Sequence, residues 1–597
     1  MNSAPRSSSI RYWSAALTVS AVLTTIGFIV DESPLRGWEV LLVLAGAFAV
    51  LALIGVATSK RKGLPALLPA DVLWKLTGVA LLYNCLANLN LYVTPLQAAI
   101  PVALTAGTCC LLWAVMGRWS RVFWVPFLLL GFAQGIGFME YGTRLNSLVL
   151  AEVLEASATE AGAYLSWINL LFASIAVCAV WWLCLLPGKV LQGQPRRAMV
   201  NTGLVYCLLG LVCGLATPGQ DEDTELYWPY TEGYRLYLTY NEALYNNEKT
   251  INCVTSLPSP AQEPSKLPTL KGGEGVVLVV HIGESVRADR MGINGYGRDT
   301  TPWLSSQSGK GLINFTDCIS AACDTCQAQI AILTDARRDV HEQDPELVAR
   351  TGSVLDLFNA NGFDVYCFRG ARCAEKLKYD RVVHLLTRCA RQCFYAPGSP
   401  WTAVPQMGEV LREHNSGENM VFFINNEGSH TPFSHYDRED TPFLPAGDNF
   451  GIPAQHAEEV NNAYDSTIHY TDEFVRRVAQ QLQGRPFVYV YVSDHGEYLG
   501  HDGIWGRGGL GASKYSYHST TGCRVGMFVL YSPEFEKLHP HFAEALKELS
   551  AHAGMTVGHE HIFHTLLGLF GVETPHYNGD LDLCSPAAKP YDGPRPE

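Results

Sequence analysis

The chain has 597 residues, of which 48% are hydrophobic, and a formal net charge of -14. This length predicts two or more domains, and the negative charge excludes a nucleic-acid partner because no basic stripe is available to neutralise phosphates. Long apolar runs fill the first 217 residues, whereas the remainder has the charges, turns and short strands of a globular domain.

Seven apolar segments in the first part are long enough to be membrane spans, since a helix needs about 20 residues to cross a bilayer. Basic residues gather in every second connection, as the positive-inside rule expects of cytoplasmic loops. If the N-terminus is cytoplasmic, the seventh span leaves the rest of the chain on the outer side. The expected spans are residues 12–30, 40–57, 73–92, 97–116, 122–138, 165–186 and 200–215.

One connection between the spans differs from the others. Residues 146–164 place apolar side chains at helical spacing and carry the acids Glu152, Glu155 and Glu160. This pattern predicts an amphipathic helix at the outer membrane face, and a solvated connector is the alternative. After the last span, residues 218–274 are rich in tyrosine and proline, which predicts an interfacial linker.

Ten of the 17 cysteines lie in the second part of the chain, from Cys253 to Cys584. An even number of cysteines favours disulfides and an oxidising compartment. The close pairs Cys367/Cys373 and Cys389/Cys393 could instead be metal ligands.

From residue 275 onward, short runs rich in β-branched residues alternate with helical patterns. This alternation predicts an α/β domain with a sheet covered by helices on both faces, and ligands in such sheets collect at the carboxyl ends of strands. The expected strands are residues 276–282, 364–368, 420–425, 487–492 and 525–531, and expected helices include 354–360 and 472–483.

Acids and histidines follow three of these predicted strands. Glu284 comes after the first strand, Glu427 and His430 come after the third, and Asp494 and His495 come after the fourth. Two carboxylate oxygens and a histidine nitrogen at one sheet edge indicate a metal site, with zinc as the natural ion and manganese as a less selective one.

A nucleophile is expected between these segments. Thr325 stands at the start of a helix-like stretch, where a zinc-bound hydroxyl can ionise near neutral pH and attack phosphorus. Ser320 and Cys326 are the competing candidates, and the residues alone leave the choice open.

Several motifs resemble one known family. GESVRADRMGINGYGRDTTPWL at residues 283–304 resembles the opening motif of the bacterial phosphoethanolamine transferases that modify lipopolysaccharide, a family of the alkaline-phosphatase and sulfatase superfamily. TCQAQIAILT, which begins at Thr325, is similar to the heptose-modifying branch of that family. Four further segments match family motifs in the same order: EGSHTPF (427–433), NAYDSTIHYTD (462–472), VSDHGEYLG (492–500) and FHTLLGLFGV (563–572).

The resemblance implies three parts of the chain. Residues 1–217 would form a helical transmembrane domain, although the family's usual five helices make two N-terminal spans additional. Residues 218–274 would be a periplasmic linker, and residues 275–597 a periplasmic domain with the α/β sulfatase or alkaline-phosphatase fold.

Site residues follow from the same resemblance, position by position. It implies that Thr325 is the nucleophile and His430 a phosphate contact. His518 occupies the position of a second histidine in the heptose-modifying branch, and Arg507 stands near the place where other members carry a histidine. Glu160 matches an acidic position on the outer-face helix and would orient the donor's ammonium group. The zinc ligands implied are Glu284, Thr325, Asp494 and His495.

The implied reaction moves phosphoethanolamine from phosphatidylethanolamine to lipopolysaccharide, at lipid A or a core sugar, through a zinc-bound phospho-threonine. The enzyme would be a monomer in the bacterial inner membrane. A phosphoglycerol transferase is an alternative, and so is a periplasmic phosphodiesterase or sulfatase-like hydrolase. A sulfatase is disfavoured because Cys318, Cys323 and Cys326 lack the CxPSR-like context that its modified cysteine needs. A catalytically inactive envelope protein is disfavoured because the implied ligands are intact.

Overall fold

The structure is a computed structural model whose described residues fall into two compact units, and each unit is presented by itself. The spans expected at residues 12–30 and 40–57 and the amphipathic stretch 146–164 lie outside the described part of the chain. The described residues are 67–87, 95–126, 128–129, 167–216, 275–338, 347–370, 378–395, 400–415, 417–433, 441–447, 453–500, 505–506 and 521–593, with short helical pieces between 240 and 255.

The first unit is helical, and its helices coincide with four expected spans: 73–92, 97–116, 165–186 and 200–215. Its two longest helices approach each other closely, because a Cβ atom added to Gly107 would lie 2.6 Å from Cys207 Sγ and 2.8 Å from Gly203 O. Small residues at such a crossing are typical of membrane helices. The helices are α3 (Ala70–Ala87), α4 (Pro95–Met116), α8 (Trp167–Leu183), α9 (Leu186–Leu191) and α10 (Arg196–Ala216).

Large apolar side chains also point outward from this unit. Trp181 is 70% exposed, Leu208 is 60% exposed and Val177 is 57% exposed, which suits a lipid-facing surface. Within the described residues, two helical segments are long and apolar enough to cross a bilayer, Val102–Pro126 and Ala173–Leu191. Seven spans therefore stay a prediction.

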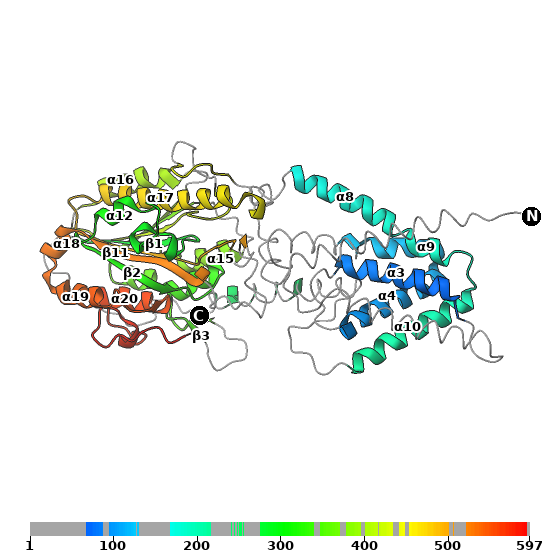
Figure 1. Ribbon diagram of the computed structural model, residues 1–597. Helices are drawn as coiled ribbons and strands as arrows, with labels where there is room; N and C mark the ends of the chain where they lie inside the picture. Colours follow the sequence, from blue (N-terminus) through cyan, green and yellow to red (C-terminus); the bar gives the residue numbers. More distant parts are fainter. Residues whose placement is uncertain are drawn as a thin grey trace, which may run out of the picture. The chain divides into compact units, whose positions relative to one another are not determined.

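The second unit is built around an eight-stranded sheet in the order β12-β2-β11-β8-β1-β7-β5-β6. Figure 1 labels three of these strands, β1, β2 and β11. The five strands expected from the sequence are all present. The strands are β1 (Val277–Gly283), β2 (Leu312–Ile319), β5 (Asp364–Arg369), β6 (Gln392–Tyr395), β7 (Met420–Asn425), β8 (Phe487–Ser493), β11 (Arg524–Tyr531) and β12 (Val557–Gly558), with two small ribbons made of β3 (Arg337–Arg338), β4 (Leu347–Val348), β9 (Tyr498–Leu499) and β10 (Trp505–Gly506).

Strand direction brings four chain segments to one edge of this sheet. β1 is parallel to β7 and β8, and β11 is antiparallel to both β8 and β2, so β2 runs in the same direction as β1. β12 is parallel to β2. The carboxyl ends of β1, β2, β8 and β12 therefore share an edge, whereas β11 runs in the opposite direction.

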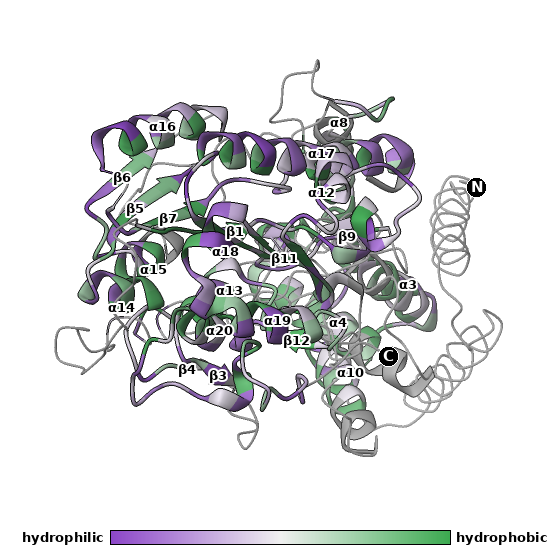
Figure 2. Ribbon diagram, turned by 90° about the vertical axis from the view of Figure 1, so that its left-hand side faces the viewer, coloured by the Kyte–Doolittle hydropathy of each residue, from purple (hydrophilic) through white to green (hydrophobic). Residues whose placement is uncertain are grey.

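Helices cover both faces of the sheet, as the sequence predicts. In Figure 1, α12, α16 and α17 lie on one side of the strands, and α19 and α20 lie on the other. Figure 2 shows β7 mostly in the green of hydrophobic residues, whereas α16 carries both purple and green. The helices are α12 (Pro302–Ser306), α13 (Thr325–Leu333), α14 (Val354–Ala360), α15 (Lys378–Leu386), α16 (Ala403–Glu413), α17 (Ala457–Gln481), α18 (Pro533–Leu538), α19 (Ala543–Ala551) and α20 (Glu560–Phe570).

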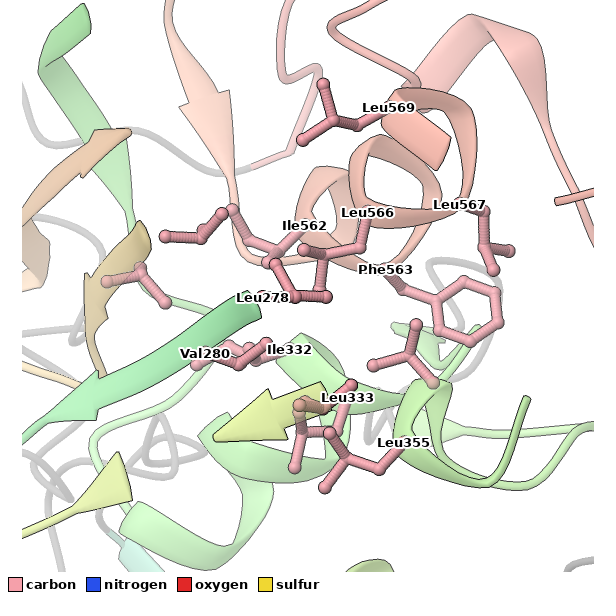
Figure 3. Packing of buried hydrophobic residues seen from close by; sticks show 14 of the residues in the cluster. Leu278, Val280, Ile332, Leu333, Leu355, Ile562, Phe563, Leu566, Leu567 and Leu569 are labelled. Carbon is pink, nitrogen blue, oxygen red and sulfur yellow. The ribbon is translucent and has the colours of Figure 1, made fainter. Parts of the chain in front are cut away.

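Alternate residues of β1 serve the two faces. Leu278 and Val280 belong to a core that includes Ile332 of α13 and Leu566 of α20 (Figure 3). His281 belongs to the opposite face, where its ring lies 5.5 Å from that of Phe474 in α17. Burial lowers the pKa of His281 to about 3, so this histidine is neutral at physiological pH.

α17 begins fifteen residues earlier than the helix expected at 472–483, at Ala457, and it anchors the segment that follows β1. Asp472 accepts hydrogen bonds from the backbone N–H groups of Trp303 (2.9 Å) and Leu304 (2.8 Å) at the start of α12. Burial raises the pKa of Asp472 from 3.8 to about 6, although these two hydrogen bonds oppose the shift.

Asp472→Asn is expected to change how stability depends on pH. Because the folded-state pKa is raised, the stabilising contribution of protonated Asp472 is complete below about pH 4 and is lost as the pH rises through about 6. Between pH 4 and pH 7, the free energy of unfolding of the variant should therefore rise relative to that of wild type by about 2–3 kcal/mol. The melting temperature of the variant should rise relative to wild type over the same range. Thermal unfolding of both proteins across this range checks it, and a constant difference would contradict the assignment.

The cysteines correct one expectation. The eight described cysteines of this unit occur as thiols, so the expected disulfides are not formed among them. Cys367 and Cys393 are register partners on the neighbouring strands β5 and β6. The sequence suggests Cys367/Cys373 and Cys389/Cys393 as possible metal ligands, and Cys373 lies outside the described residues.

Candidate active site

Four of the residues singled out from the sequence converge at the carboxyl edge of the sheet. Glu284 follows β1, Asp494 and His495 follow β8, and Thr325 is the first residue of α13. Glu284, Asp494 and His495 offer ligand atoms that all lie within 4.8 Å of one another, and all three are buried. Thr325 is half-buried beside them.

His495 Nε2 is the centre of this cluster. It lies 3.3 Å from Glu284 Oε1, 3.3 Å from Asp494 Oδ2 and 3.2 Å from Thr325 Oγ1. Thr325 Oγ1 is also 3.4 Å from Glu284 Oε2. Ligand atoms at the corners of a tetrahedron around zinc, each roughly 2.0–2.1 Å from the ion, stand about 3.3 Å apart. The donor set and its spacing therefore fit a tetrahedral zinc ion.

Neighbouring groups prepare each donor for this role. His495 Nδ1 lies 3.0 Å from the carbonyl of Gly496, so the neutral ring carries its hydrogen on Nδ1 and its lone pair on Nε2. Asp494 Oδ1 accepts hydrogen bonds from the backbone N–H groups of Ser285 (2.9 Å) and His495 (2.7 Å), which turns Oδ2 toward the cluster. The Ser285 hydroxyl donates to Glu284 Oε1 at 2.9 Å.

Thr325 owes its position to the segment between β2 and α13. Ser320 Oγ lies 2.6 Å from the carbonyl of Asp494, which ties this segment to the ligands of β8. Asp324 caps α13 by accepting from the N–H of Gln327 at 3.0 Å. The helix N-terminus carries partial positive charge, so it favours an ionised Thr325 oxygen or a phosphoryl group there.

The structure also separates Thr325 from its two competitors. Cys326 is only 2% exposed and belongs to the hydrophobic core, and the Ser320 hydroxyl is engaged with backbone carbonyls. The Thr325 hydroxyl is the one of the three that lies within 3.4 Å of both Glu284 and His495.

His559 is a residue that the sequence did not single out. It follows β12, accepts from the N–H of Ala321 through Nδ1 (3.3 Å) and donates to the carbonyl of Ser493 through Nε2 (3.0 Å). Burial lowers the pKa of His559 to about 3, so it is a neutral bridge between the Thr325 segment and β8. It lies beside FHTLLGLFGV, but its role depends on contacts that only the fold creates.

His430 lies in a turn fixed next to Glu284. The N–H of Ser429 donates to the Glu284 carbonyl at 2.9 Å, and a Cβ atom on Gly428 would lie 2.9 Å from Glu284 N. His430 Nδ1 donates to the carbonyl of Thr431 at 2.6 Å. Its role as a phosphate contact stays a prediction. Three other expected substrate contacts, His518, Arg507 and Glu160, lie outside the described residues.

A second cluster of potential metal ligands occurs at the opposite edge, where β5 begins. Asp364, His414 and Glu418 lie close together, but the Tyr366 hydroxyl donates to His414 Nε2 at 2.7 Å. Arg391 pairs with Asp364 at 2.8 Å. His414 Nε2 therefore already accepts a hydrogen bond and is not available to a metal. We interpret these groups as an ion-pair network.

Comparisons with known proteins agree with this fold. The Sulfatase family profile matches residues 276–572. The phosphoethanolamine transferase EptA of Salmonella typhimurium is 23% identical over 496 residues, which are 79% of this chain and 86% of that protein. EptA of Helicobacter pylori is 25% identical over 493 residues, which are 79% and 85% of the two chains.

One full-length structure is similar as well. The integral membrane protein lipooligosaccharide phosphoethanolamine transferase A from Neisseria meningitidis superposes with a TM-score of 0.59 at 19% identity, over 94% of this chain and 98% of that one. This similarity concerns the fold. The second unit thus contains a Sulfatase-family domain, with a cluster of candidate metal ligands at the carboxyl edge of its sheet. The chain carries a Sulfatase-family domain, is similar in sequence to bacterial phosphoethanolamine transferases, and is an enzyme.

Proposed function

We propose that this enzyme transfers phosphoethanolamine from phosphatidylethanolamine to a lipopolysaccharide acceptor, with Thr325 as the nucleophile. The observation that carries the proposal is the Thr325 hydroxyl at the N-terminus of α13, 3.4 Å from Glu284 and 3.2 Å from His495. The names of the relatives supply the transferred group and, for the Neisseria protein, a lipooligosaccharide as acceptor.

Glu284, Asp494, His495 and Thr325 would hold a zinc ion. Zinc, when bound, would lower the pKa of the Thr325 hydroxyl and neutralise charge on the phosphoryl oxygens. Manganese is a less selective alternative for the same donors.

The transfer would take place in two steps. Thr325 Oγ1 attacks the phosphorus of phosphatidylethanolamine, the bond from phosphorus to the glycerol oxygen breaks, and diacylglycerol leaves with a proton. An acceptor oxygen then attacks the phosphorus of the covalent phosphoethanolamine–threonine, and Thr325 Oγ1 is released and protonated. His430 and His518 would donate hydrogen bonds to the leaving or equatorial phosphoryl oxygens. Arg507 and Glu160 remain candidate substrate contacts.

We also place the enzyme in the bacterial inner membrane as a monomer with its catalytic domain in the periplasm. Two observations support this location: the similar Neisseria protein is an integral membrane protein, and the first unit has an outward apolar surface. A membrane position is also required by the chemistry, because the donor and the acceptor are both lipids. The proposed acceptor is lipid A or a core sugar of lipopolysaccharide. The motif resemblance to the heptose-modifying branch of the family supports the core sugar.

A donor assay tests the proposal. The full-length protein with zinc is incubated with phosphatidylethanolamine or phosphatidylglycerol, with and without purified lipopolysaccharide. Diacylglycerol release from phosphatidylethanolamine, together with a lipopolysaccharide product heavier by one phosphoethanolamine group, is expected. Release of diacylglycerol from phosphatidylglycerol alone would indicate a phosphoglycerol transferase, and release of free phosphoethanolamine without a lipopolysaccharide product would indicate a phosphodiesterase.

A further inference from the structure

Ser285 adopts a backbone conformation that L-residues seldom use. Among the described residues it is the non-glycine residue with a positive φ, at 59°. The left-handed region brings Cβ close to the following carbonyl oxygen, so a residue remains there only when its surroundings hold it. Ser285 lies directly after Glu284, at the point where β1 delivers its carboxylate to the cluster.

This conformation lets one residue contact two of the proposed metal ligands. The N–H of Ser285 donates to Asp494 Oδ1 at 2.9 Å, and its hydroxyl donates to Glu284 Oε1 at 2.9 Å. Rotation of Ser285 to a negative φ would move these donors relative to each other. The two carboxylates would then lose a common hydrogen-bond partner.

Tyr464 fixes the backbone at Ser285 and Arg287 by hydrogen bonds. Its hydroxyl donates to the carbonyl of Ser285 at 2.6 Å and accepts from the N–H of Arg287 at 3.0 Å, so it spans the residues on either side of Val286. Tyr464 is fully buried in α17 and packs against the ring of Phe433 at 5.3 Å between centroids.

The helix that carries Tyr464 is itself fixed to the same segment. Asp465, the next residue of α17, pairs with Arg290 at 3.2 Å and with Arg298 at 2.9 Å. The Tyr296 hydroxyl donates to Asp465 Oδ2 at 2.8 Å. Tyr464 therefore presents its hydroxyl from a rigid element rather than from a loop.

We propose that Tyr464 is a positioning residue for the metal site, acting through Ser285 to orient Glu284 and Asp494. The inference rests on the proposed zinc site and assigns no contact between Tyr464 and the substrate. Partners of metal ligands set the direction of the donor atoms, and their loss commonly costs 10–100-fold in metal affinity. Without the hydroxyl, Ser285 would relax from the left-handed region and the carboxylates would be less well ordered.

Tyr464→Phe tests this, with Tyr489→Phe as the matched control. Tyr489 is also a fully buried tyrosine. Its hydroxyl lies 2.7 Å from His281 Nδ1, and His281 is not one of the proposed metal ligands. Zinc affinity of the full-length proteins is measured by competition with a chromophoric chelator, and melting temperature is measured without metal. We expect Tyr464→Phe to weaken zinc binding by about 10–100-fold, whereas Tyr489→Phe lowers the melting temperature with zinc affinity unchanged within about twofold.

A double-mutant cycle with Ser285→Gly separates positioning from a general loss of stability. Glycine reaches a φ of 59° without strain, so Tyr464→Phe should weaken zinc binding less in the Ser285→Gly background than in wild type. Unchanged zinc affinity in Tyr464→Phe, or equal losses in Tyr464→Phe and Tyr489→Phe, would overturn the inference. Failure of the wild type to bind zinc would instead refute the metal site, and this inference with it.

Discussion

Thr325→Ala is expected to lower phosphoethanolamine transfer by at least about a thousandfold while the protein stays folded. Removal of a nucleophile that forms a covalent intermediate leaves only the catalysis that binding and the remaining donors provide. The fold should tolerate the change because Thr325 is half-buried, and the Asp324 cap of α13 is retained. The change in unfolding free energy should be about 1 kcal/mol or less. Initial rates of diacylglycerol release measure the effect.

Thr325→Ser is the matched control because it keeps a hydroxyl at the start of α13. We expect this variant to retain transfer well above the alanine variant, at a reduced rate, because the shorter side chain has more rotational freedom. Ser320→Ala and Cys326→Ala should still form the covalent intermediate. Transfer by Thr325→Ala within about tenfold of wild type would show that another residue is the nucleophile.

Removal of the metal is expected to have the second large effect. Chelation should abolish transfer, and added zinc should restore it. At a zinc concentration near a thousand times the dissociation constant, binding stabilises the folded state by about 4 kcal/mol, so the melting temperature should rise by several degrees. Zinc affinity should fall as the pH drops, since His495 must be neutral and Glu284 and Asp494 ionised to bind the ion.

His495→Ala and His414→Ala separate the two clusters of potential ligands. His495→Ala should lower the zinc content by about one ion per chain and remove the zinc-dependent rise in melting temperature. His414→Ala should leave both unchanged, because His414 Nε2 accepts from Tyr366. Metal analysis after removal of excess zinc measures the content. Loss of zinc in His414→Ala but not in His495→Ala would place the metal at the opposite edge of the sheet.

The strands that the sequence predicts are those whose composition reflects burial on both faces. β1, β7 and β8 read as nearly unbroken apolar runs because every residue in them is buried. β2 was missed because it alternates buried residues with partly exposed ones, among them Asp317. The antiparallel direction of β11 could not be predicted, since an apolar run has the same composition in either direction.

The early start of α17 was missed for a related reason. Its first half carries polar residues on the face that is buried, where they hold the segment after β1 rather than a hydrophobic core. Asp465 is an example, because it pairs with Arg290 and Arg298 of that segment. A hydrophobic period cannot indicate such a helix, although the motif NAYDSTIHYTD marks it.

The candidate site was predictable to the extent that its residues follow strands or begin a helix. Glu284, Asp494 and His495 stand where strands end, and Thr325 stands where α13 begins. Ser285, Tyr464 and His559 were not assigned roles because their contacts join segments far apart in the chain. A hydrogen bond across 179 residues, as between Tyr464 and Ser285, leaves no periodic signal in the sequence.

The most direct test of the account is the intact mass of the full-length protein after incubation with zinc and phosphatidylethanolamine in the absence of acceptor. The account predicts that wild type gains the mass of one phosphoethanolamine group, that Thr325→Ala gains nothing, and that added lipopolysaccharide discharges the adduct. An adduct that persists in Thr325→Ala, or diacylglycerol release by wild type with no adduct under any condition, would contradict it.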